Sequence, residues 1–250
     1  VTPTAADNDR PRLWVDRVFA AKGAGTVVTG TLTGGRLRVD DAVTALPQDL
    51  GVRVRALQSH HRELTEAIPG SRLAVNLGGV DHDQLARGSV LVRPEQWHQT
   101  MQVDAELQIL DRLDHEVSRR GAHVAYIGSG EHPVRLRILG PDVLRAGEAG
   151  HVRLYFDHPL PLMLGDRFVL RESGRGETIG GGRVLDAQPL RRASKAAPDD
   201  SVDRIIAEHG WIEAAHIERL TGERREPNLG KWVVDPPALE ALVADLDALI

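Results

Sequence analysis

The sequence predicts a mainly β fold of two consecutive β-barrels followed by a small α-helical, winged-helix-like module. Three observations support this fold class. Short β-branched runs separated by Gly, Pro or Asp recur from residue 12 to about residue 190. A small, polar and charged stretch, RRASKAAPDD, then interrupts the pattern. Helical spacing follows it, so we expect three domains, in residues 1–97, 98–192 and 193–250.

The first predicted barrel contains six strand-like runs. Short runs at regular spacing, with turn signals between them, are typical of all-β barrels and sandwiches. In VRVRALQ, the alternation predicts one face for Val52, Val54 and Ala56 and the opposite face for the two arginines between them. The six runs are RLWVDRVF, TVVTGTL, DAVTAL, VRVRALQ, SRLAVNL and SVLVRP.

The second predicted barrel begins after a joint near Pro94 to His98 and repeats the same kind of pattern. Its runs are again short, rich in Val, Leu and Ile, and bounded by Gly, Pro or Asp. Two barrels of roughly 90 residues each are the simplest division of this part of the chain. The six runs are MQVDAELQIL, GAHVAYIG, VRLRILG, AGHVRLYFD, DRFVLRES and ETIGGGRVLD.

Helix signals replace strand signals in the last segment. Asp199, Asp200 or Ser201 can cap a helix that runs to about His209, with Gly210 as its stop. EAAHIERL predicts a second helix, GKWVV a short strand, and PALEALVADLDALI a third helix. The apolar stripe predicted for the third helix consists of Leu239, Leu242, Val243 and Leu246.

Composition excludes several classes of protein. The 250 residues include no cysteine, which rules out disulfides, thiolate zinc sites and cysteine nucleophiles. No apolar run approaches the roughly 18 residues of a membrane span and no signal peptide opens the chain, so we expect no membrane partner and a cytoplasmic location. The net charge of −5 argues against general nucleic-acid binding. Because the chain begins with Val, we expect a segment of a longer protein.

The glycine-rich stretch KGAGTVVTG tests for a nucleotide-binding loop. A Walker loop needs Lys-Ser or Lys-Thr after its last glycine, but Thr31 and Leu32 follow Gly30. A dinucleotide-binding loop needs GxGxxG at the start of a helix, but β-branched residues follow Gly25. We therefore expect a hairpin turn that leads into a barrel strand, and this result disfavours a nucleotide-dependent enzyme.

The same stretch carries a family resemblance. DRVFAAKGAGTVVTGTLTGG and PGSRLAVNLGGVDHDQLARGSVL resemble the second domain of EF-Tu-type translational GTPases, and within them the SelB family, the elongation factors specific for selenocysteinyl-tRNA. GSGEHPVRLRILG and GDRFVLRESGRGETIGGGRVLD are similar to the third domain of these proteins. The helical segment more weakly resembles the start of a fourth domain of winged helices.

The resemblance implies a pocket in the first barrel for the aminoacyl group. Its residues correspond to Asp16, Arg17 and Arg72. Two fixed arginines would hold a selenolate and disfavour a neutral serine side chain, and Asp16 would orient them. In a regular strand Asp16 and Arg17 point to opposite faces, so a shared pocket requires a bulge. His60 and His61 could add a donor or simply be loop residues.

For the second barrel the resemblance implies contacts with the tRNA backbone around RESGRG. The candidates are Arg171, Glu172, Ser173 and Arg175. Arg119, Arg120 and Arg135 are weaker candidates that could equally be solvated arginines. We expect no catalytic residue and no metal site, because the acidic DHD at 81–83 lacks a partner at ligand spacing.

The family's partners follow from the resemblance in the same way. The parent protein would use GTP and Mg²⁺ in a preceding GTPase domain, whose motifs this sequence lacks, so we expect no cofactor and no enzymatic activity here. Its partners would be selenocysteinyl-tRNA, the ribosome and, through later winged helices, an mRNA recoding hairpin. Two alternatives remain open: the barrels of another translational GTPase, such as an EF-Tu-like factor or the gamma subunit of initiation factor two, or a β-barrel interaction module without an RNA role.

Overall fold

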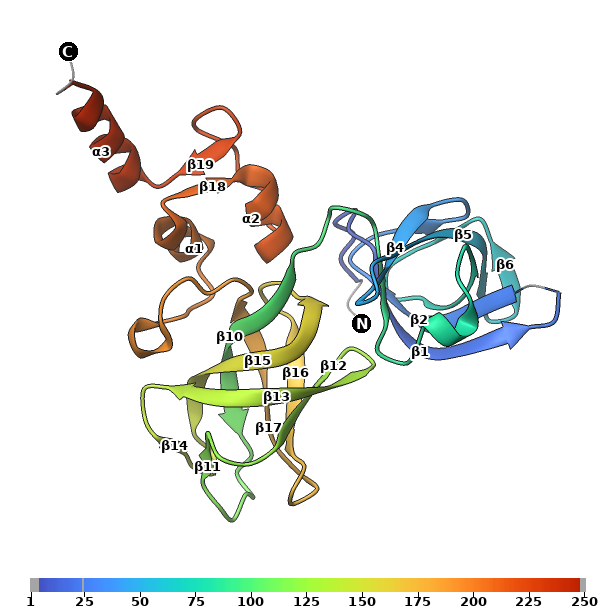
Figure 1. The fold of residues 1–250 in the computed structure, drawn as a ribbon, viewed down its shortest axis with the longest axis horizontal. Helices are drawn as coiled ribbons and strands as arrows, with labels where there is room; N and C mark the ends of the chain where they lie inside the picture. The colour runs from blue at the N-terminus through green and yellow to red at the C-terminus, as the bar shows by residue number, and fades with distance from the viewer. Residues whose placement is uncertain (1–4, 24, 248–250) are drawn as a thin grey trace. The chain divides into compact units, whose positions relative to one another are not determined.

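A computed structural model of the chain describes residues 5–23 and 25–247. Two β-barrels and a helical segment follow one another along the sequence, as predicted (Figure 1). By its internal contacts the chain forms two compact units. The first contains the chain up to Gln99 together with Val124–Pro133 and Asp157–Pro161, and the second contains the remainder.

The first barrel closes through the pairing of β4 with β5, which joins the two ends of the strand order β4-β9-β1-β2-β8-β5. A further strand, β6, extends β5, and β3 pairs with β7. The strands are β1 (Arg12–Ala21), β2 (Gly25–Thr33), β3 (Leu37–Arg38), β4 (Ala42–Leu46), β5 (Leu50–Ser59), β6 (Arg62–Leu64), β7 (Glu66–Ala67), β8 (Arg72–Gly78) and β9 (Val90–Val92), with a 3₁₀ turn at His82–Gln84.

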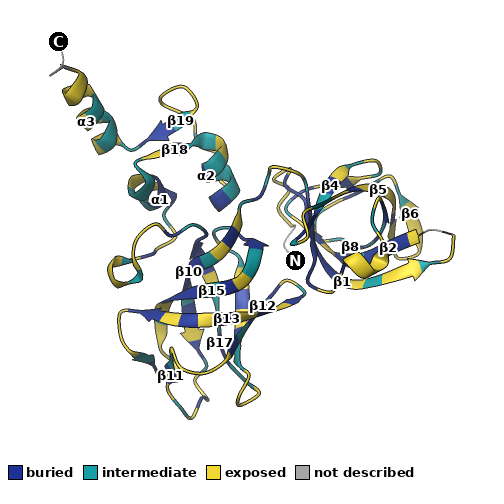
Figure 2. Cartoon of the chain, viewed as in Figure 1, coloured by how far each residue is buried: buried dark blue, intermediate teal, exposed yellow. Residues whose placement is uncertain are grey.

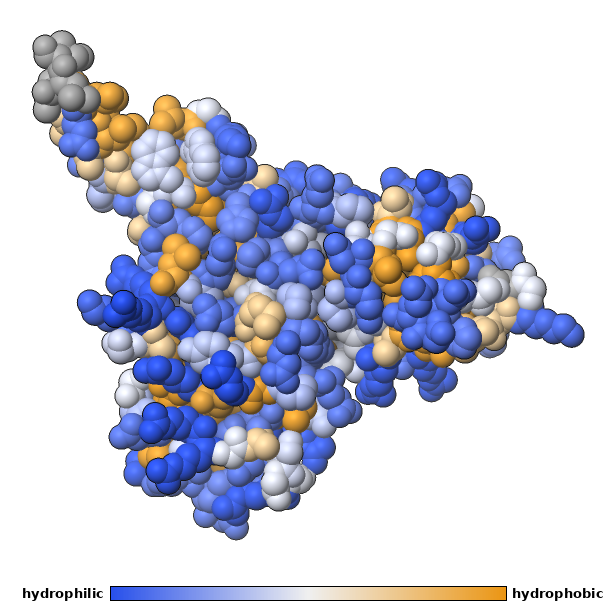
Figure 3. Space-filling view, in the orientation of Figure 1, coloured by the Kyte–Doolittle hydropathy of each residue, from blue (hydrophilic) through white to orange (hydrophobic). Residues whose placement is uncertain are grey.

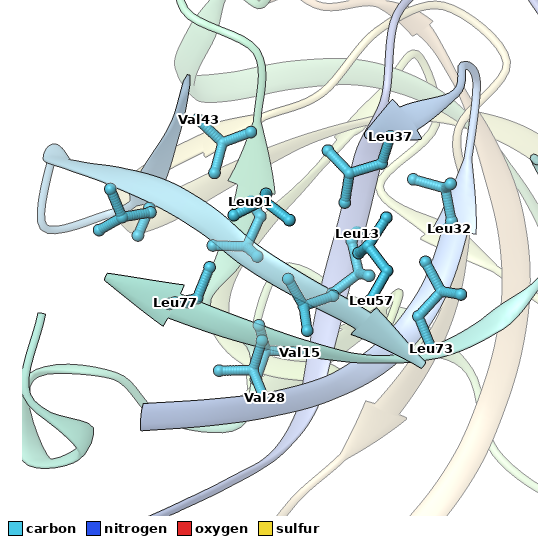
Figure 4. Packing of buried hydrophobic residues seen from close by; sticks show 14 of the residues in the cluster. Leu13, Val15, Val28, Leu32, Leu37, Val43, Leu57, Leu73, Leu77 and Leu91 are labelled. Atoms are coloured by element: carbon cyan, nitrogen blue, oxygen red, sulfur yellow. The ribbon is translucent and has the colours of Figure 1, made fainter. Parts of the chain in front are cut away.

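Leucines and valines from all six ring strands fill the first barrel (Figure 4). Leu13, Leu32, Leu57 and Leu73 are each no more than 1% exposed. The predicted alternation in β5 is wrong at Ala56, because the register against β8 shifts between Val54 and Ala56. Leu57 therefore fills the inward position and Ala56 is exposed. A bulge of this kind bends the strand and helps a sheet to close into a barrel.

The second barrel is closed in the order β10-β15-β13-β12-β16-β17. Along β13, buried and exposed residues alternate, so one face lines the core and the other faces outward (Figure 2). The strands are β10 (Gln99–Ile109), β11 (Val117–Ser118), β12 (His123–Ile127), β13 (Gly130–Leu139), β14 (Val143–Leu144), β15 (Ala149–Pro161), β16 (Arg167–Glu172) and β17 (Glu177–Asp186); β11 pairs with β14.

The predicted linker contains a 3₁₀ turn at Ala193–Lys195, and the helical module follows it. Ser201 caps the first helix by accepting a hydrogen bond from the Arg204 backbone N–H, and Gly210 ends that helix with a positive φ of 69°. The elements are α1 (Val202–His209), β18 (Trp211–Glu213), α2 (Ala214–Thr221), β19 (Trp232–Val234) and α3 (Pro236–Asp247); β18 pairs with β19.

The predicted stripe of the third helix is only partly covered. Leu239 and Leu242 are half-buried, whereas Val243 and Leu246 are 50% and 51% exposed. The last three residues of the predicted helix lie outside the described residues. None of the described helices has the length and apolar content needed to cross a membrane.

Candidate aminoacyl site and RNA-contacting turn

A bulge in β1 brings the predicted pocket residues to one face of the first barrel. The register of β1 against β2 shifts between Val15 and Arg17. Val15 is fully buried and Val18 packs against the same core, so the two residues between them both lie on the outer side. The bulge thus provides the geometry that a shared site for Asp16 and Arg17 requires.

Strand register then places Arg72 on this same outer face. Arg72 of β8 is opposite Thr31 of β2, and Thr29, two residues before Thr31, is opposite Arg17 of β1. Residues two apart in a strand share a face, and so do residues directly opposite one another. Arg17, Thr29 and Arg72 therefore face the same way across three neighbouring strands.

An ion pair joins two of the three predicted pocket residues. The Arg72 guanidinium donates a short hydrogen bond to Asp16 Oδ2, and Thr29 Oγ1 donates to Asp16 Oδ1 at 2.5 Å. Burial alone would raise the pKa of Asp16, but the hydrogen bonds from Arg72 and Thr29 and the charges of both arginines outweigh it and lower that pKa. Asp16 is thus an ionised, positioned carboxylate, and Thr29 is a neighbour of the candidate site that the sequence did not reveal.

Both arginines remain accessible to solvent. The Arg72 side chain is 54% exposed, and Arg17 is exposed. Within the described part of the chain, Arg17 has no carboxylate at ion-pairing distance, although its charge helps to lower the Asp16 pKa. The face therefore carries two positive charges against one negative charge and can accept one further anion.

Arg72 also borders a hollow of about 900 Å³ that Ser59, His60 and Arg62 help to line. The Ser59 hydroxyl donates to the Arg72 carbonyl at 2.8 Å and lies 3.1 Å from His60 Nδ1. His60 and His61 form the two-residue loop between β5 and β6, and both have positive φ, at 51° and 62°. They are loop residues, and His60 reaches the edge of the hollow.

The four candidates of the second barrel lie at the turn between β16 and β17. Arg171 donates to the Gly176 carbonyl at 2.6 Å, and the Ser173 backbone N–H donates to Ala122 at 2.8 Å. Glu172 is 19% exposed and lies within 3.6 Å of Arg175, whose side chain is 55% exposed. Arg175 and Ser173 are therefore exposed at this turn, whereas Glu172 is largely occupied by neighbouring side chains.

The main neighbour of Glu172 is His115, which the sequence analysis did not select. His115 Nε2 lies 3.0 Å from Glu172, and His115 Nδ1 lies 3.1 Å from Asp114. The hydrogen bond to Asp114, aided by the one to Glu172, raises the pKa of His115 against the opposing effect of burial. The two residues are 57 positions apart, so only the folded barrel reveals the pair.

Asp114, His115 and Glu177 could together hold a cation, because their donor atoms lie within 4.8 Å of one another. A metal ligand must be a neutral imidazole, however, and the two carboxylates around His115 favour its protonated form. This cluster is therefore better described as a histidine held between carboxylates that raise its pKa, and it bridges the loop before β11 to the β16–β17 turn.

Two domain families match the chain. Residues 25–92 match the family described as "Elongation factor Tu domain 2", and residues 97–191 match "Selenocysteine-specific elongation factor, beta-barrel domain". With the two closed barrels, these matches place the chain in the class of EF-Tu-type translation factors.

Similar proteins narrow this class. A selenocysteine-specific elongation factor of Desulfomicrobium baculatum is 36% identical over 190 residues, which are 75% of this chain and 30% of that protein. One of Haemophilus influenzae is 32% identical over 189 residues, with the same coverage. The chain belongs to the family of selenocysteine-specific elongation factors. It spans about 30% of the length of the curated relatives it matches.

A solved structure extends the similarity in fold to the helical module. A bacterial selenocysteine-specific elongation factor EF-Sec superimposes with a TM-score of 0.77 over 99% of this chain and 43% of its own, at 18% identity. At this level of identity the comparison concerns the fold, which includes the module after the second barrel.

Proposed function

We propose that this chain is the aminoacyl-tRNA-binding part of a selenocysteine-specific elongation factor. In the full-length protein a GTPase domain would bind and hydrolyse GTP with Mg²⁺, and the whole would deliver selenocysteinyl-tRNA to the ribosome at a recoded UGA. Contact with the mRNA recoding hairpin would fall to winged helices outside this chain. The relatives' names and the barrel-family match support this assignment.

The observation that carries the proposal is the shared face of Asp16, Arg17 and Arg72 on the bulged edge of the first barrel. A selenol is a stronger acid than a thiol, whose pKa is about 8.5, so selenocysteine is an anion at neutral pH. Two arginines with only one carboxylate between them favour that anion. A neutral serine side chain on the same tRNA would leave the excess positive charge uncompensated.

The neighbouring hollow has room for the 3′ end of the tRNA. It adjoins Arg72, so an aminoacyl group at the arginines and the terminal nucleotide in the hollow could be bound together. In the second barrel, Arg171, Glu172, Ser173 and Arg175 would meet the tRNA backbone. Of these, Arg175 and the Ser173 hydroxyl are the best placed, because Glu172 is already engaged by His115.

The test is protection of the aminoacyl ester against hydrolysis by the full-length protein with GTP. Selenocysteinyl-tRNA and seryl-tRNA are compared on the same tRNA body. We expect Arg72→Ala to reduce protection of the selenocysteinyl ester at least tenfold and to leave the seryl ester within about twofold. Arg38→Ala is the matched control, since Arg38 is an exposed, ion-paired arginine elsewhere on the same barrel.

The alternatives predict other results. Equal protection of both esters by the unaltered protein would indicate a general tRNA carrier. Protection of neither would favour a barrel module without an RNA role. An equal loss for both esters in Arg72→Ala would reject the charge-based selection while leaving tRNA binding in place.

A further inference from the structure

Residues 5–11, which precede β1, pack against the first barrel without forming a helix or a strand. We call them the N-terminal strap. The backbone N–H groups of Asn8 and Arg10 both donate to the Gly34 carbonyl, at 2.8 and 3.0 Å. The fit is close, because a Cβ atom at Gly34 would lie 2.5 Å from the Arg10 carbonyl oxygen. The strap is therefore bound at a defined place on the barrel.

An ion-pair network on the largely hydrophilic surface of the first barrel (Figure 3) joins the strap to β7. Arg36 Nε donates to Asp7 of the strap at 2.7 Å, and Arg36 Nη1 donates to Glu66 of β7 at 2.6 Å. Arg38, the cross-strand neighbour of Glu66, donates to its other carboxylate oxygen at 2.5 Å. Hydrogen bonds from both arginines lower the pKa of Glu66, and the one from Arg36 lowers the pKa of Asp7. Arg36 is thus the group that bridges the strap and the strand.

Glu66 also forms part of the wall of the hollow beside Arg72. The residues that line this wall run from Glu66 to Gly70 and on to Arg72. Ala5 of the strap lies beside the same wall, since a Cβ atom at Gly70 would be 3.3 Å from the Ala5 Cβ atom. The strap therefore meets one wall of the hollow at two points, directly at Gly70 and through Arg36 at Glu66.

From these contacts we infer that Arg36 is a positioning residue, which couples the N-terminal strap to the wall of the candidate aminoacyl site. The inference rests on the proposed function, in which a GTPase domain precedes the strap. The nucleotide state of that domain acts on the strap, and the bridge from Asp7 through Arg36 to Glu66 passes the change to the hollow. The docked strap supports the wall. Withdrawal of the strap takes Asp7 away from Arg36 and lets the wall relax, so that binding of the aminoacyl end depends on GTP.

Hydrogen exchange in the full-length protein tests the contact between strap and wall without tRNA. Asp7→Asn keeps the size of the side chain and removes the charge that fixes Arg36. We expect it to speed amide exchange at Gly70, whose N–H donates to the Leu32 carbonyl, by about three- to fivefold. Glu66→Gln should have at least this effect, and adding Asp7→Asn to it should change little, because either substitution breaks the bridge.

Asp9→Asn is the matched control, since it is the same substitution two residues further along the strap. The Asp9 side chain pairs with Arg93, and the Asp9 carbonyl also accepts from Arg93, so the strap stays in place in this variant. Asparagine tolerates the positive φ of 54° at this position. Exchange at Gly70 should stay within about 1.5-fold of the parent. Equal acceleration in Asp7→Asn and Asp9→Asn, or none in either, would overturn the role of Arg36.

Ester protection by the full-length protein then tests the coupling to the nucleotide. Protection of the selenocysteinyl ester is compared with GTP and with GDP, and the ratio of the two measures the coupling. We expect Asp7→Asn to lower this ratio by about three- to fivefold, whereas Asp9→Asn leaves it within about twofold. An unchanged ratio in Asp7→Asn would reject the coupling. A parent that protects no ester but shows the exchange effect would refute the proposed function while supporting the link between strap and wall.

Discussion

The Asp104 carboxylate on β10 accepts two hydrogen bonds from the Arg153 guanidinium on the neighbouring strand β15, at 2.6 and 2.7 Å. Both residues occupy outward positions of their strands, yet their side chains are only 3% and 5% exposed. The pair belongs to a larger buried network, since the charge of Asp104 acts on Asp186, which accepts a hydrogen bond from Arg204 of α1. Barrel and helical module are thus linked by buried charges within one compact unit.

Breaking this pair should destabilise the second barrel strongly. We expect Asp104→Ala to lower the free energy of unfolding by about 3–5 kcal/mol, because it leaves the Arg153 charge buried without its partner. Urea denaturation of the chain measures the effect. Glu106→Ala is the control on the same strand, since Glu106 pairs with Arg183 while both are more than 40% exposed. Glu106→Ala should lower the free energy of unfolding by less than about 1 kcal/mol. Equal losses of stability in Asp104→Ala and Glu106→Ala would contradict the idea that burial makes the Asp104–Arg153 pair important.

Thr29→Val tests the carboxylate of the candidate aminoacyl site. The variant removes the hydroxyl that donates to Asp16, so the pKa of Asp16 should rise while the ion pair with Arg72 remains. NMR titration of the Asp16 carboxyl carbon measures this change. Because the folded-state pKa is lowered, the carboxylate stabilises the fold above its unfolded pKa near 3.8, and this stability is lost as the pH falls through the folded value. Thr31→Val, on the same face, should leave that titration unchanged.

His132 should make stability depend on pH in an acidic window. Burial, with a smaller effect from His158, lowers the pKa of His132 from 6.5 to about 4. As the pH falls, His132 is therefore protonated in the unfolded chain at a higher pH than in the folded chain. The free energy of unfolding falls as the pH drops from about 6.5 to about 4, by up to about 3 kcal/mol.

Unfolding of His132→Gln and of the parent between pH 7 and pH 4 isolates this contribution. The difference between the two proteins should shrink as the pH falls, because only the parent loses stability through His132. His151→Gln, a substitution of an exposed histidine, should follow the parent throughout. A constant difference between His132→Gln and the parent would show that the fold does not lower the pKa of His132.

Gly182 in β17 marks a close approach of two strands. A Cβ atom at this position would lie 1.8 Å from the Glu106 carbonyl oxygen of β10, so even Gly182→Ala must displace backbone. We expect this variant to lower the melting temperature by at least 10 °C or to prevent folding. Gly174→Ala is the control, because nothing lies within 4 Å of its Cβ position and its φ is not positive. A parent-like melting temperature for Gly182→Ala would contradict the tight packing of β10 against β17.

The strands were predictable from the sequence because barrel burial imposes a period of two, which is visible in runs such as VRLRILG. The exceptions have local causes. Ala56 was assigned to the wrong face because the regular alternation of residues 52 to 55 gives no sign of the register shift that follows Val54. The strand at Trp211–Glu213 was missed because three residues carry too little pattern, and its existence depends on pairing with Trp232–Val234.

The candidate site was predictable only in part. The resemblance to a family named Asp16, Arg17 and Arg72, and the bulge now accounts for their shared face. Thr29 and His115 were not found, because each acts through a partner that strand register or loop packing brings near. The three-domain division and the RNA contacts of the second barrel remain predictions.

The tip of the β5–β6 hairpin has a consequence for protein engineering. A two-residue loop with positive φ at both positions is best served by Asn-Gly, yet His60 and His61 occupy it. Holding non-glycine residues in left-handed conformations costs roughly 1–2 kcal/mol each. Replacing the two histidines by Asn-Gly should therefore yield a more heat-resistant barrel. If the variant also protected the aminoacyl ester less well, the two histidines would contribute to that protection at the expense of the thermal stability of the barrel.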